Sequence, residues 1–328
     1  DGEPSIDVWA MDVARFGDYA SPQYGTIKSS ENYERRFIMT FPNETLPKGR
    51  KQKTTALYDR FVNQGAVMGD SFGLENVLWF ANNKEDAHEE PTIKRSRSHD
   101  YVSKEVINVR ENVGLIEVAN FAKHEFKGTD ARKFLDHVMA GKLPKPGRIS
   151  LSPMLSYRGK LCGDLTVACH DENEFIVFGS GAAQEMHRRW FESHLDKFNV
   201  NYKNRSDEYH GLSIAGPNSR KVLEKIVRED VTNEKFKFRD SSRMFVGSVP
   251  AIVNRISFTG ELGYEIYVSP HYQIKLYEEL MEAGKEFNIK PFGGRALMSM
   301  RLEKNWGAWT LDYRPDFTAK ETGLDTFI

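Results

Sequence analysis

Pairs of short apolar segments, each pair followed by an amphipathic stretch, constrain the fold of this chain more than any other feature of its sequence. Residues 164–169 and 174–178 are predicted to be strands on either side of the polar turn 170–173. Residues 251–258 and 264–268 repeat this arrangement around a glycine-containing turn. Strands joined by tight turns pair antiparallel, and here each pair precedes a helix. The pattern therefore favours α+β layers with antiparallel sheets over a doubly wound parallel sheet.

The remaining regular segments fit the same α+β interpretation. Strands are predicted at residues 113–118, 124–127 and 212–215. A helix is predicted after Thr129, which can cap it, with Gly141 just beyond its end. Further helices are predicted at residues 182–195, from Gly216-Pro217 onward with Pro217 near the first helical position, and after Ser269-Pro270.

The first 100 residues have a different character. Aromatic residues are scattered among polar and basic stretches, and residues 55–64, ended by Gly65, have the pattern of a short helix. We predict that residues 1–100 are otherwise irregular and form a linker, or the tail of a missing domain. The chain starts without Met and ends on the apolar pair Phe327-Ile328, so we expect a piece of a longer intracellular polypeptide.

Charge and motif content exclude several classes of function. With 46 Lys plus Arg against 47 Asp plus Glu, the net charge is −1, which gives no basis for binding nucleic acid or an anionic membrane. Cys162 and Cys169 do not form a disulfide framework and indicate a reducing compartment. Glycine motifs that bind dinucleotides or triphosphates are absent, and so are cysteines or histidines at metal-ligand spacing. By elimination, any chemistry is expected to use carboxylates.

Asp164 is the first carboxylate candidate. It follows Gly163 and opens an apolar strand, where aspartate is uncommon and where the glycine would let a ligand approach the backbone. A carboxylate in a part-buried pocket can act as a general base, because desolvation raises its pKa. The alternative is an aspartate that caps a turn, and the sequence taken alone favours that alternative.

Other segments offer weaker candidates. Glu265 enters a strand just after a glycine-containing turn, where a buried carboxylate would pair with an amino-pyrimidine edge; a solvated strand glutamate is the commoner alternative. Gly179 and Gly181 lie at a helix start and would bind an anion through free N–H groups, or simply form a turn. Arg301 and Glu303 are predicted to form a structural ion pair near two packed tryptophans.

Five segments follow one another in a characteristic order: residues 113–118 (VGLIEV), 163–167 (GDLTV), 211–217 (GLSIAGP), 259–265 (TGELGYE) and 300–304 (MRLEK). Taken in order, these segments resemble the folate-binding, aminomethyltransferase-like region of the dimethylglycine and sarcosine dehydrogenases. That region is itself similar to the T-protein of the glycine cleavage system. Stretches at residues 21–24, 56–58 and 75–80 resemble the dehydrogenases and not the stand-alone T-proteins, which lack this part.

The resemblance implies a function and gives the candidate residues their roles. In those dehydrogenases an FAD domain oxidises an N-methyl group to an iminium, and the one-carbon unit passes to tetrahydrofolate, which becomes 5,10-methylenetetrahydrofolate. Asp164 matches the catalytic carboxylate beside the reactive folate nitrogens, and Glu265 matches the residue that grips the pterin ring. Phe258 matches a pterin-site aromatic residue that is often tyrosine, and Phe121 matches an apolar wall of the pocket.

The resemblance also implies an organisation. Residues 101–328 would form a T-protein-like folate-binding domain that lacks the family's final β-barrel, and residues 1–100 would be the tail of an FAD-dependent domain absent from this chain. Leu297 stands where T-proteins carry an arginine, which argues against their reaction on a lipoyl carrier. A stand-alone aminomethyl or methyl transferase and a non-catalytic folate-binding module stay open as alternatives. The N-methyl amino acid substrate is left undefined, and the expected compartment is the cytoplasm of a bacterium or the mitochondrial matrix of a eukaryote.

Overall fold

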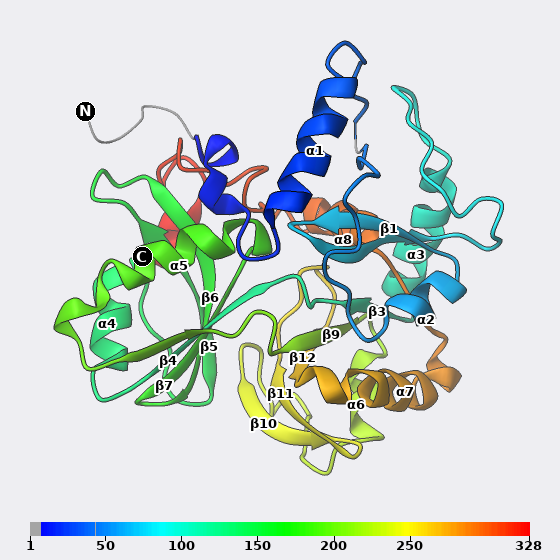
Figure 1. Cartoon of the computed structure of the whole chain (residues 1–328). Helices are drawn as coiled ribbons and strands as arrows, with labels where there is room; N and C mark the ends of the chain where they lie inside the picture. The colour runs from blue at the N-terminus through cyan, green and yellow to red at the C-terminus, as the bar shows by residue number, and fades with distance from the viewer. Residues whose placement is uncertain (1–7, 43) are drawn as a thin grey trace.

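The computed structural model describes residues 8–42 and 44–328, which form two lobes with one large sheet each, and a small hairpin (Figure 1). The hairpin and several helices lie at one end of the second lobe. Short 3-10 turns connect many of these elements: η1 (Trp9–Met11), η2 (Val13–Arg15), η3 (Gly181–Ala183), η4 (Leu195–Lys197), η5 (Pro270–Tyr272), η6 (Lys285–Phe287) and η7 (Leu324–Phe327).

The first lobe contains a five-stranded sheet. Its strands in spatial order are β5 (Arg148–Leu155), β6 (Leu161–Asp171), β7 (Glu174–Gly179), β4 (Ala122–Lys127) and β8 (Asn201–Asn204). All neighbouring strands are antiparallel, so the predicted hairpin of residues 164–178 is confirmed as β6–β7. Helices α4 (Ala131–Val138) and α5 (Gln184–Glu192) cover one face, where Leu135 and Phe191 pack on Val167 and Val177.

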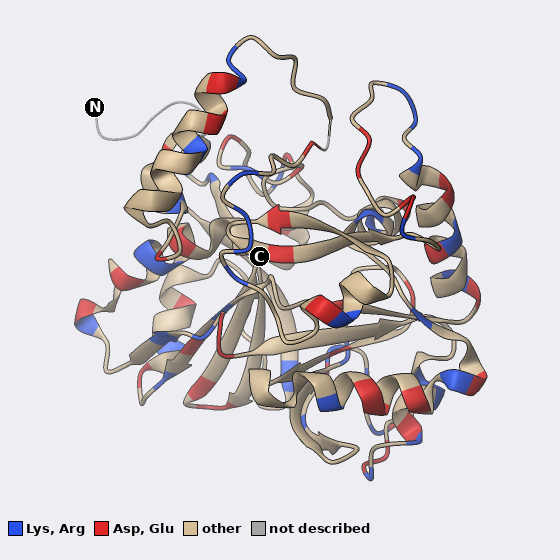
Figure 2. Ribbon diagram, turned by 45° about the vertical axis from the view of Figure 1, so that its right-hand side comes forward, with Lys and Arg blue, Asp and Glu red and all other residues tan. Residues whose placement is uncertain are grey.

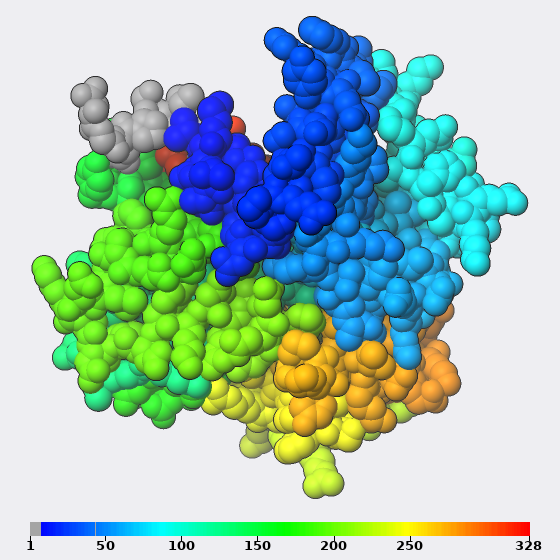
Figure 3. Space-filling view, in the orientation of Figure 1, coloured from blue at the N-terminus to red at the C-terminus, as the bar shows by residue number. Residues whose placement is uncertain are grey.

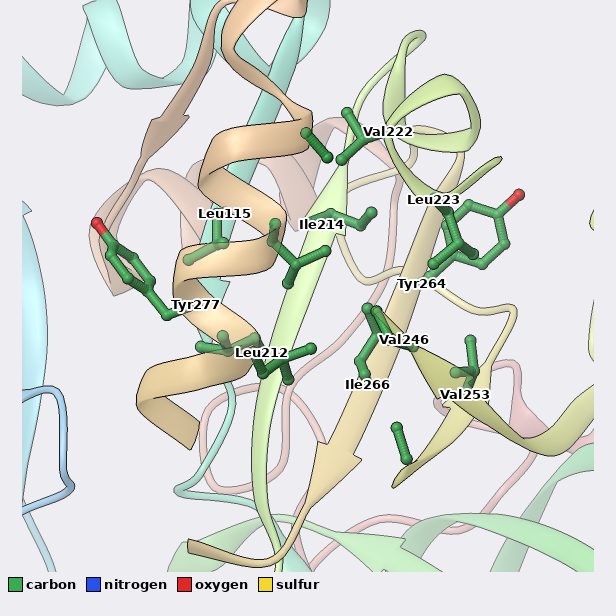
Figure 4. Close-up of a cluster of buried hydrophobic side chains, with 14 of the residues drawn as sticks. Leu115, Leu212, Ile214, Val222, Leu223, Val246, Val253, Tyr264, Ile266 and Tyr277 are labelled. Carbon is green, nitrogen blue, oxygen red and sulfur yellow. The ribbon is translucent and has the colours of Figure 1, made fainter. Parts of the chain in front are cut away.

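The second lobe contains a six-stranded sheet. Its strands in spatial order are β10 (Ser241–Val246), β11 (Val249–Asn254), β12 (Gly263–Val268), β9 (His210–Ala215), β3 (Val113–Glu117) and β13 (Ile289–Pro291). The pairing of β13 with β3 is parallel and the others are antiparallel. Helices α6 (Ser219–Glu224) and α7 (Gln273–Ala283) cover one face, and Figure 4 shows Val222 and Tyr277 of these helices packed around Leu212, Ile214 and Ile266 of the sheet.

Two predicted helix starts lie too early in the sequence. Helix α4 begins at Ala131 with Asp130 as its N-cap residue, so Thr129 is not the cap. Helix α6 begins at Ser219 with Asn218 at the N-cap, so Pro217 lies before the helix and not at its first position. Gly216 explains the second difference, because its φ of +132° is not helical and the chain must turn there before the helix begins.

The prediction of an irregular segment before residue 100 was wrong. The elements found there are α1 (Pro22–Glu34), α2 (Tyr58–Asn63), the antiparallel hairpin of β1 (Ala66–Ser71) and β2 (Leu74–Phe80), and the start of α3 (Ser98–Glu111). The predicted helix at residues 55–64 is confirmed as the shorter α2. The hairpin turns through Phe72 and Gly73, both with positive φ, and this two-residue turn usually carries Asn-Gly or Asp-Gly. The unusual Phe72 therefore hid the hairpin in the sequence.

A buried carboxylate joins this hairpin to the second lobe. Glu105 of α3 accepts hydrogen bonds from the backbone N–H of Phe80 (2.7 Å) and from that of Gly293 (2.9 Å), which precedes α8 (Gly294–Glu303). A Cβ at Gly293 would lie only 2.3 Å from the backbone carbonyl oxygen of Leu78, so a larger residue would not fit there.

Helix α1 and the segment after it stand away from the two lobes, at the upper edge of the molecule (Figure 3).

The two lobes meet across a buried apolar layer that we call the inter-sheet layer. It contains Ile116, Val118, Ala168, Ile176, Phe178, Ala215, Ile252 and Tyr267, together with Val109, Ile149, Phe292, Ala296 and Met300. Its members come from both sheets and from α3 and α8. Any side chain that shares a strand face with these residues therefore points between the lobes.

Arg301 does not pair with Glu303, and that prediction was wrong. Residues two apart on a helix point in different directions. Arg301, which is buried, forms an ion pair with Asp312 and donates to the Trp306 carbonyl oxygen (2.9 Å), whereas Glu303 pairs with Arg110 (2.7 Å).

Substitution of Arg301 with Met is expected to lower the free energy of unfolding by about 2 kcal/mol, because it removes two hydrogen bonds made by a buried cation. The matched substitution Glu303→Gln, on the exposed side of the same helix, is expected to change it by less than about 0.5 kcal/mol. Urea unfolding of both variants measures the difference, and equal midpoints would contradict this role of Arg301.

The distribution of charged side chains and the state of the two cysteines are ordinary for a chain of this composition. Basic and acidic side chains are intermixed over the elements visible in Figure 2. Cys162 and Cys169 both lie on β6 and are free thiols. Within residues 8–42 and 44–328, no helix is long and apolar enough to cross a bilayer, and no group of three or more His, Cys, Asp or Glu side chains is placed to hold a metal ion.

Candidate functional site

Asp164 and Glu265 lie on the facing surfaces of the two sheets. Thr166 of β6 pairs with Phe178 of β7, and Asp164, two residues before Thr166, has its side chain on the same face. The Phe178 ring stacks on the Tyr267 ring of β12 with 4.6 Å between centroids. Glu265 lies two residues before Tyr267 on the same strand face. The stacked pair thus joins the two strand faces that carry the carboxylates.

Asp164 has the properties of a proton-exchanging group. Its side chain is only partly exposed, and burial raises its pKa to about 7. Its backbone lies opposite Pro153 of β5. The pKa of Tyr313 is raised by burial and, to a smaller extent, by the charge of Asp164. Tyr313 is therefore close enough to Asp164 for the two groups to interact. A carboxylate that titrates near neutral pH can take up and return a proton during a reaction.

Glu265 is a partly exposed carboxylate whose orientation is fixed. Its Oε2 accepts a hydrogen bond from the Tyr267 hydroxyl (2.8 Å). Burial raises the pKa of Glu265 to about 7, and the hydrogen bond from Tyr267 and the charges of Lys304 and Lys123 oppose that rise. An oriented carboxylate in an apolar layer suits a flat ligand that presents neighbouring N–H groups.

Phe121 and Phe258, the two aromatic residues predicted for the site, lie in different parts of the structure. Phe121 is half-buried and packs against the inter-sheet layer, which agrees with a place in the wall of a pocket between the lobes. Phe258 is half-buried in the loop that joins β11 to β12, seven residues before Glu265. Lys304 ties this loop to the end of α8, because its Nζ donates to the Ser257 carbonyl oxygen (2.9 Å).

Comparison with known proteins identifies the family. A family model described as "GCVT N-terminal domain" matches residues 57–328. The chain belongs to the GCVT family. A second model, "FAD dependent oxidoreductase central domain", matches residues 1–55.

Individual relatives agree with this assignment. Over its full length the chain is 35% identical to "Dimethylglycine dehydrogenase, mitochondrial" from Homo sapiens, of which it covers 38%. It is 26% identical over 98% of its length to "Sarcosine dehydrogenase, mitochondrial" from Homo sapiens, covering 40% of that protein. The chain therefore spans well under half the length of these relatives.

The fold of the GCVT domain is shown by a solved structure. The glycine cleavage system aminomethyltransferase T from Bartonella henselae superposes with a TM-score of 0.68 over 81% of this chain and 66% of that protein, at 22% identity. The predicted T-protein-like α+β fold is thereby confirmed, and the described residues contain no closed barrel.

Close packing accounts for the two glycines of the GCVT domain that were predicted to bind an anion. A Cβ on Gly181 would lie 2.1 Å from the Asn120 carbonyl oxygen, and one on Gly179 would lie 2.6 Å from Leu165 and 3.2 Å from His187. These close contacts explain why both positions are occupied by glycine. Their role in binding a ligand stays a prediction.

Sequence-based prediction missed Tyr267, which orients Glu265, and the residues that contact the Tyr267 ring. Tyr267 follows Glu265 by two residues, so the period of a strand was a signal that the two share a face. Phe178 and Lys123 gave no local signal, because their contacts with Tyr267 join strands of different sheets. Gly211 allows this arrangement, since a Cβ there would lie 2.7 Å from the Tyr267 ring.

Proposed function

We propose that this GCVT domain is the tetrahydrofolate-binding region of an FAD-dependent dehydrogenase that demethylates an N-methyl amino acid of the dimethylglycine or sarcosine type. The one-carbon unit of the oxidised substrate would pass to tetrahydrofolate and give 5,10-methylenetetrahydrofolate. The observation that carries the proposal is the placement of Asp164 and Glu265 on facing sheet surfaces of a GCVT fold.

Each carboxylate suits one part of the folate chemistry. Glu265 would accept the N–H and NH₂ hydrogens of the pterin pyrimidine edge, a pairing that needs the ionised form. Asp164 would take up the proton that a folate nitrogen loses as its bond to the one-carbon unit forms, and would return a proton to the departing amine. Its pKa near 7 suits both directions of transfer at neutral pH.

The roles proposed for the aromatic residues follow from the same geometry. Phe121 would form an apolar wall of the pterin pocket, and Phe258 would stack on the ring without the hydrogen bond that a tyrosine hydroxyl would add. Gly179 and Gly181, at and just after the end of β7, would bind an anionic group of the ligand through backbone N–H groups.

The segment before the GCVT match favours a dehydrogenase over a stand-alone aminomethyltransferase. Residues 1–55 match the central domain of FAD-dependent oxidoreductases, and residues 57–328 match the GCVT domain. We propose that residues 1–100 connect the folate-binding domain to a flavin domain in the same polypeptide, which would hold the FAD. The compartment of this polypeptide would be the mitochondrial matrix in a eukaryote, because both human relatives are mitochondrial by name, or the cytoplasm in a bacterium.

The experiment that tests this function measures the fate of the methyl carbon. The protein in its full natural length is given dimethylglycine or sarcosine and an electron acceptor, with or without saturating tetrahydrofolate. In the presence of the folate we expect methylenetetrahydrofolate to form faster than added formaldehyde condenses with tetrahydrofolate without the protein, and in its absence we expect free formaldehyde. Formation no faster than this spontaneous condensation, with either substrate, would contradict the proposal.

A further inference from the structure

Lys123 is a buried cation next to the candidate folate site. It lies on β4 and its exposed fraction is 0%. Its Nζ donates to the carbonyl oxygens of Ala119 (2.7 Å) and Ser206 (3.2 Å), which are both neutral. Burial of an ammonium group costs several kcal/mol unless negative charge compensates it. The negative charges that favour the charged form of Lys123 act from further away than these two carbonyl oxygens.

Tyr267 lies between this cation and Glu265. Lys123 Nζ is 5.9 Å from the centroid of the Tyr267 ring, and the Tyr267 hydroxyl donates to Glu265 Oε2 at 2.8 Å. A cation over an aromatic face is attracted by the electrons of the ring, and here the hydroxyl of the same ring points to a carboxylate. Cation, ring and carboxylate thus form a continuous series between the lobes.

Other charged groups also act on the series formed by Lys123, Tyr267 and Glu265. Glu117 of β3 is held by Gln273 of α7, and burial raises its pKa to about 7. Asp207 pairs with Lys53 (3.1 Å) on the solvent side of Lys123. Lys304, at the end of α8, also lowers the pKa of Glu265 through its charge, and its effect is larger than that of Lys123. Burial lowers the pKa of Lys123 to about 7, opposed by the charges of Asp207, Glu117 and Glu265.

We infer that Lys123 is a positioning residue for the folate site, whose charged form, acting across the Tyr267 ring, favours the ionised Glu265 that is oriented to accept ligand N–H groups. The inference rests on the proposed function, because it assigns the ionised Glu265 to the pterin. It requires no contact between Lys123 and the ligand. The role is electrostatic, so it is separable from a packing role by the pH at which Glu265 titrates.

Lys123→Met is the informative variant, because Met keeps most of the apolar stem and removes the charge. In the ligand-free protein at its full natural length, carbon-13 NMR is expected to show the pKa of Glu265 about one unit higher than in the wild type. Folinic acid would then bind about fivefold more weakly at pH 7 and regain the wild-type affinity near pH 9. Lys127→Met, on the same strand with an exposed side chain, is the control and should leave both quantities unchanged.

A second variant covers the case in which Lys123→Met does not fold. Lys123→Gln removes the charge and keeps a polar group that can donate to the carbonyl oxygens of Ala119 and Ser206, and it should raise the pKa of Glu265 in the same direction. An unchanged Glu265 pKa in whichever variant folds would overturn the inference. That titration needs no ligand, so its outcome is independent of folate binding. A wild-type protein that fails to bind folinic acid would contradict the proposed function and not this inference.

Discussion

Replacement of Asp164 with Asn is expected to slow one-carbon transfer to folate by about 10²–10⁴-fold, the usual contribution of a positioned acid–base group. Asparagine keeps the shape of the side chain and cannot exchange a proton. Donor oxidation should keep its wild-type rate, because the flavin domain proposed to carry it out lies outside the GCVT domain. Both rates are measured in one reaction, by flavin reduction and by methylenetetrahydrofolate formation. Asp171→Asn, at the exposed end of the same strand, is the matched control.

The same substitution is expected to stabilise the protein. Burial raises the pKa of Asp164 from its ordinary 3.8 to about 7, so between these values the native state holds a proton that the unfolded state has lost. The contribution of Asp164 to stability therefore falls as the pH rises through this window, and it is lowest above pH 7. The Asn variant lacks this loss and should exceed the wild type by about 2 kcal/mol at pH 8 and by much less at pH 4.

Urea unfolding at the two pH values measures this difference. Slower transfer together with greater stability would identify Asp164 as a residue kept for function at a cost in stability. Transfer at the wild-type rate in Asp164→Asn would remove it from the mechanism, whatever happens to the stability.

The second large effect is expected at Glu265. Glu265→Gln turns an acceptor-only carboxylate into an amide with one acceptor and one donor group, so an NH₂ would face the N–H edge of the pterin. Loss of two charge-assisted hydrogen bonds costs about 3 kcal/mol, which corresponds to roughly 100-fold weaker binding. Calorimetric titration with folinic acid at pH 8, where Glu265 is mainly ionised, measures the loss.

Glu261→Gln is the control for this measurement. Glu261 lies in the turn that precedes the same strand and pairs with Arg110 (2.7 Å) at the surface. Its substitution should leave the affinity for folinic acid within about twofold of the wild type. A Glu265→Gln protein that binds as tightly as this control would show that the pterin is held elsewhere.

The fold class could be predicted from the sequence because most of its hairpins have a local sequence signal. The strand pairs β6–β7 and β11–β12 are adjacent in the chain, and their apolar runs are separated by polar or glycine-containing turns. The β1–β2 hairpin lacked such a signal, since Phe72 occupies a turn position with positive φ. Helix starts were predicted a few residues too early because Thr129 and Pro217 have the chemistry of helix starts without holding those positions.

The candidate site was predictable residue by residue, and its assembly was not. Asp164 and Glu265 stand at identifiable positions of their own strands, but the sequence does not say that the two strand faces meet. That depends on the stacking of Phe178 on Tyr267 across two sheets. Lys123 was invisible for a similar reason: an isolated lysine on a strand is usually solvated, and only the assembled layer shows that this one is fully buried.

The most direct test of the central claim is a crystal structure of the protein, in its full natural length, with folinic acid bound. The account predicts that the pterin ring lies between the two sheets, with its amino-pyrimidine edge on Glu265 and its reactive nitrogens beside Asp164. A hollow of about 480 Å³ on the second lobe is lined by Tyr209, Arg243 and Pro250, and Tyr267 also borders it. Electron density for the ligand at any place where neither carboxylate touches it, in that hollow or elsewhere, would contradict the account.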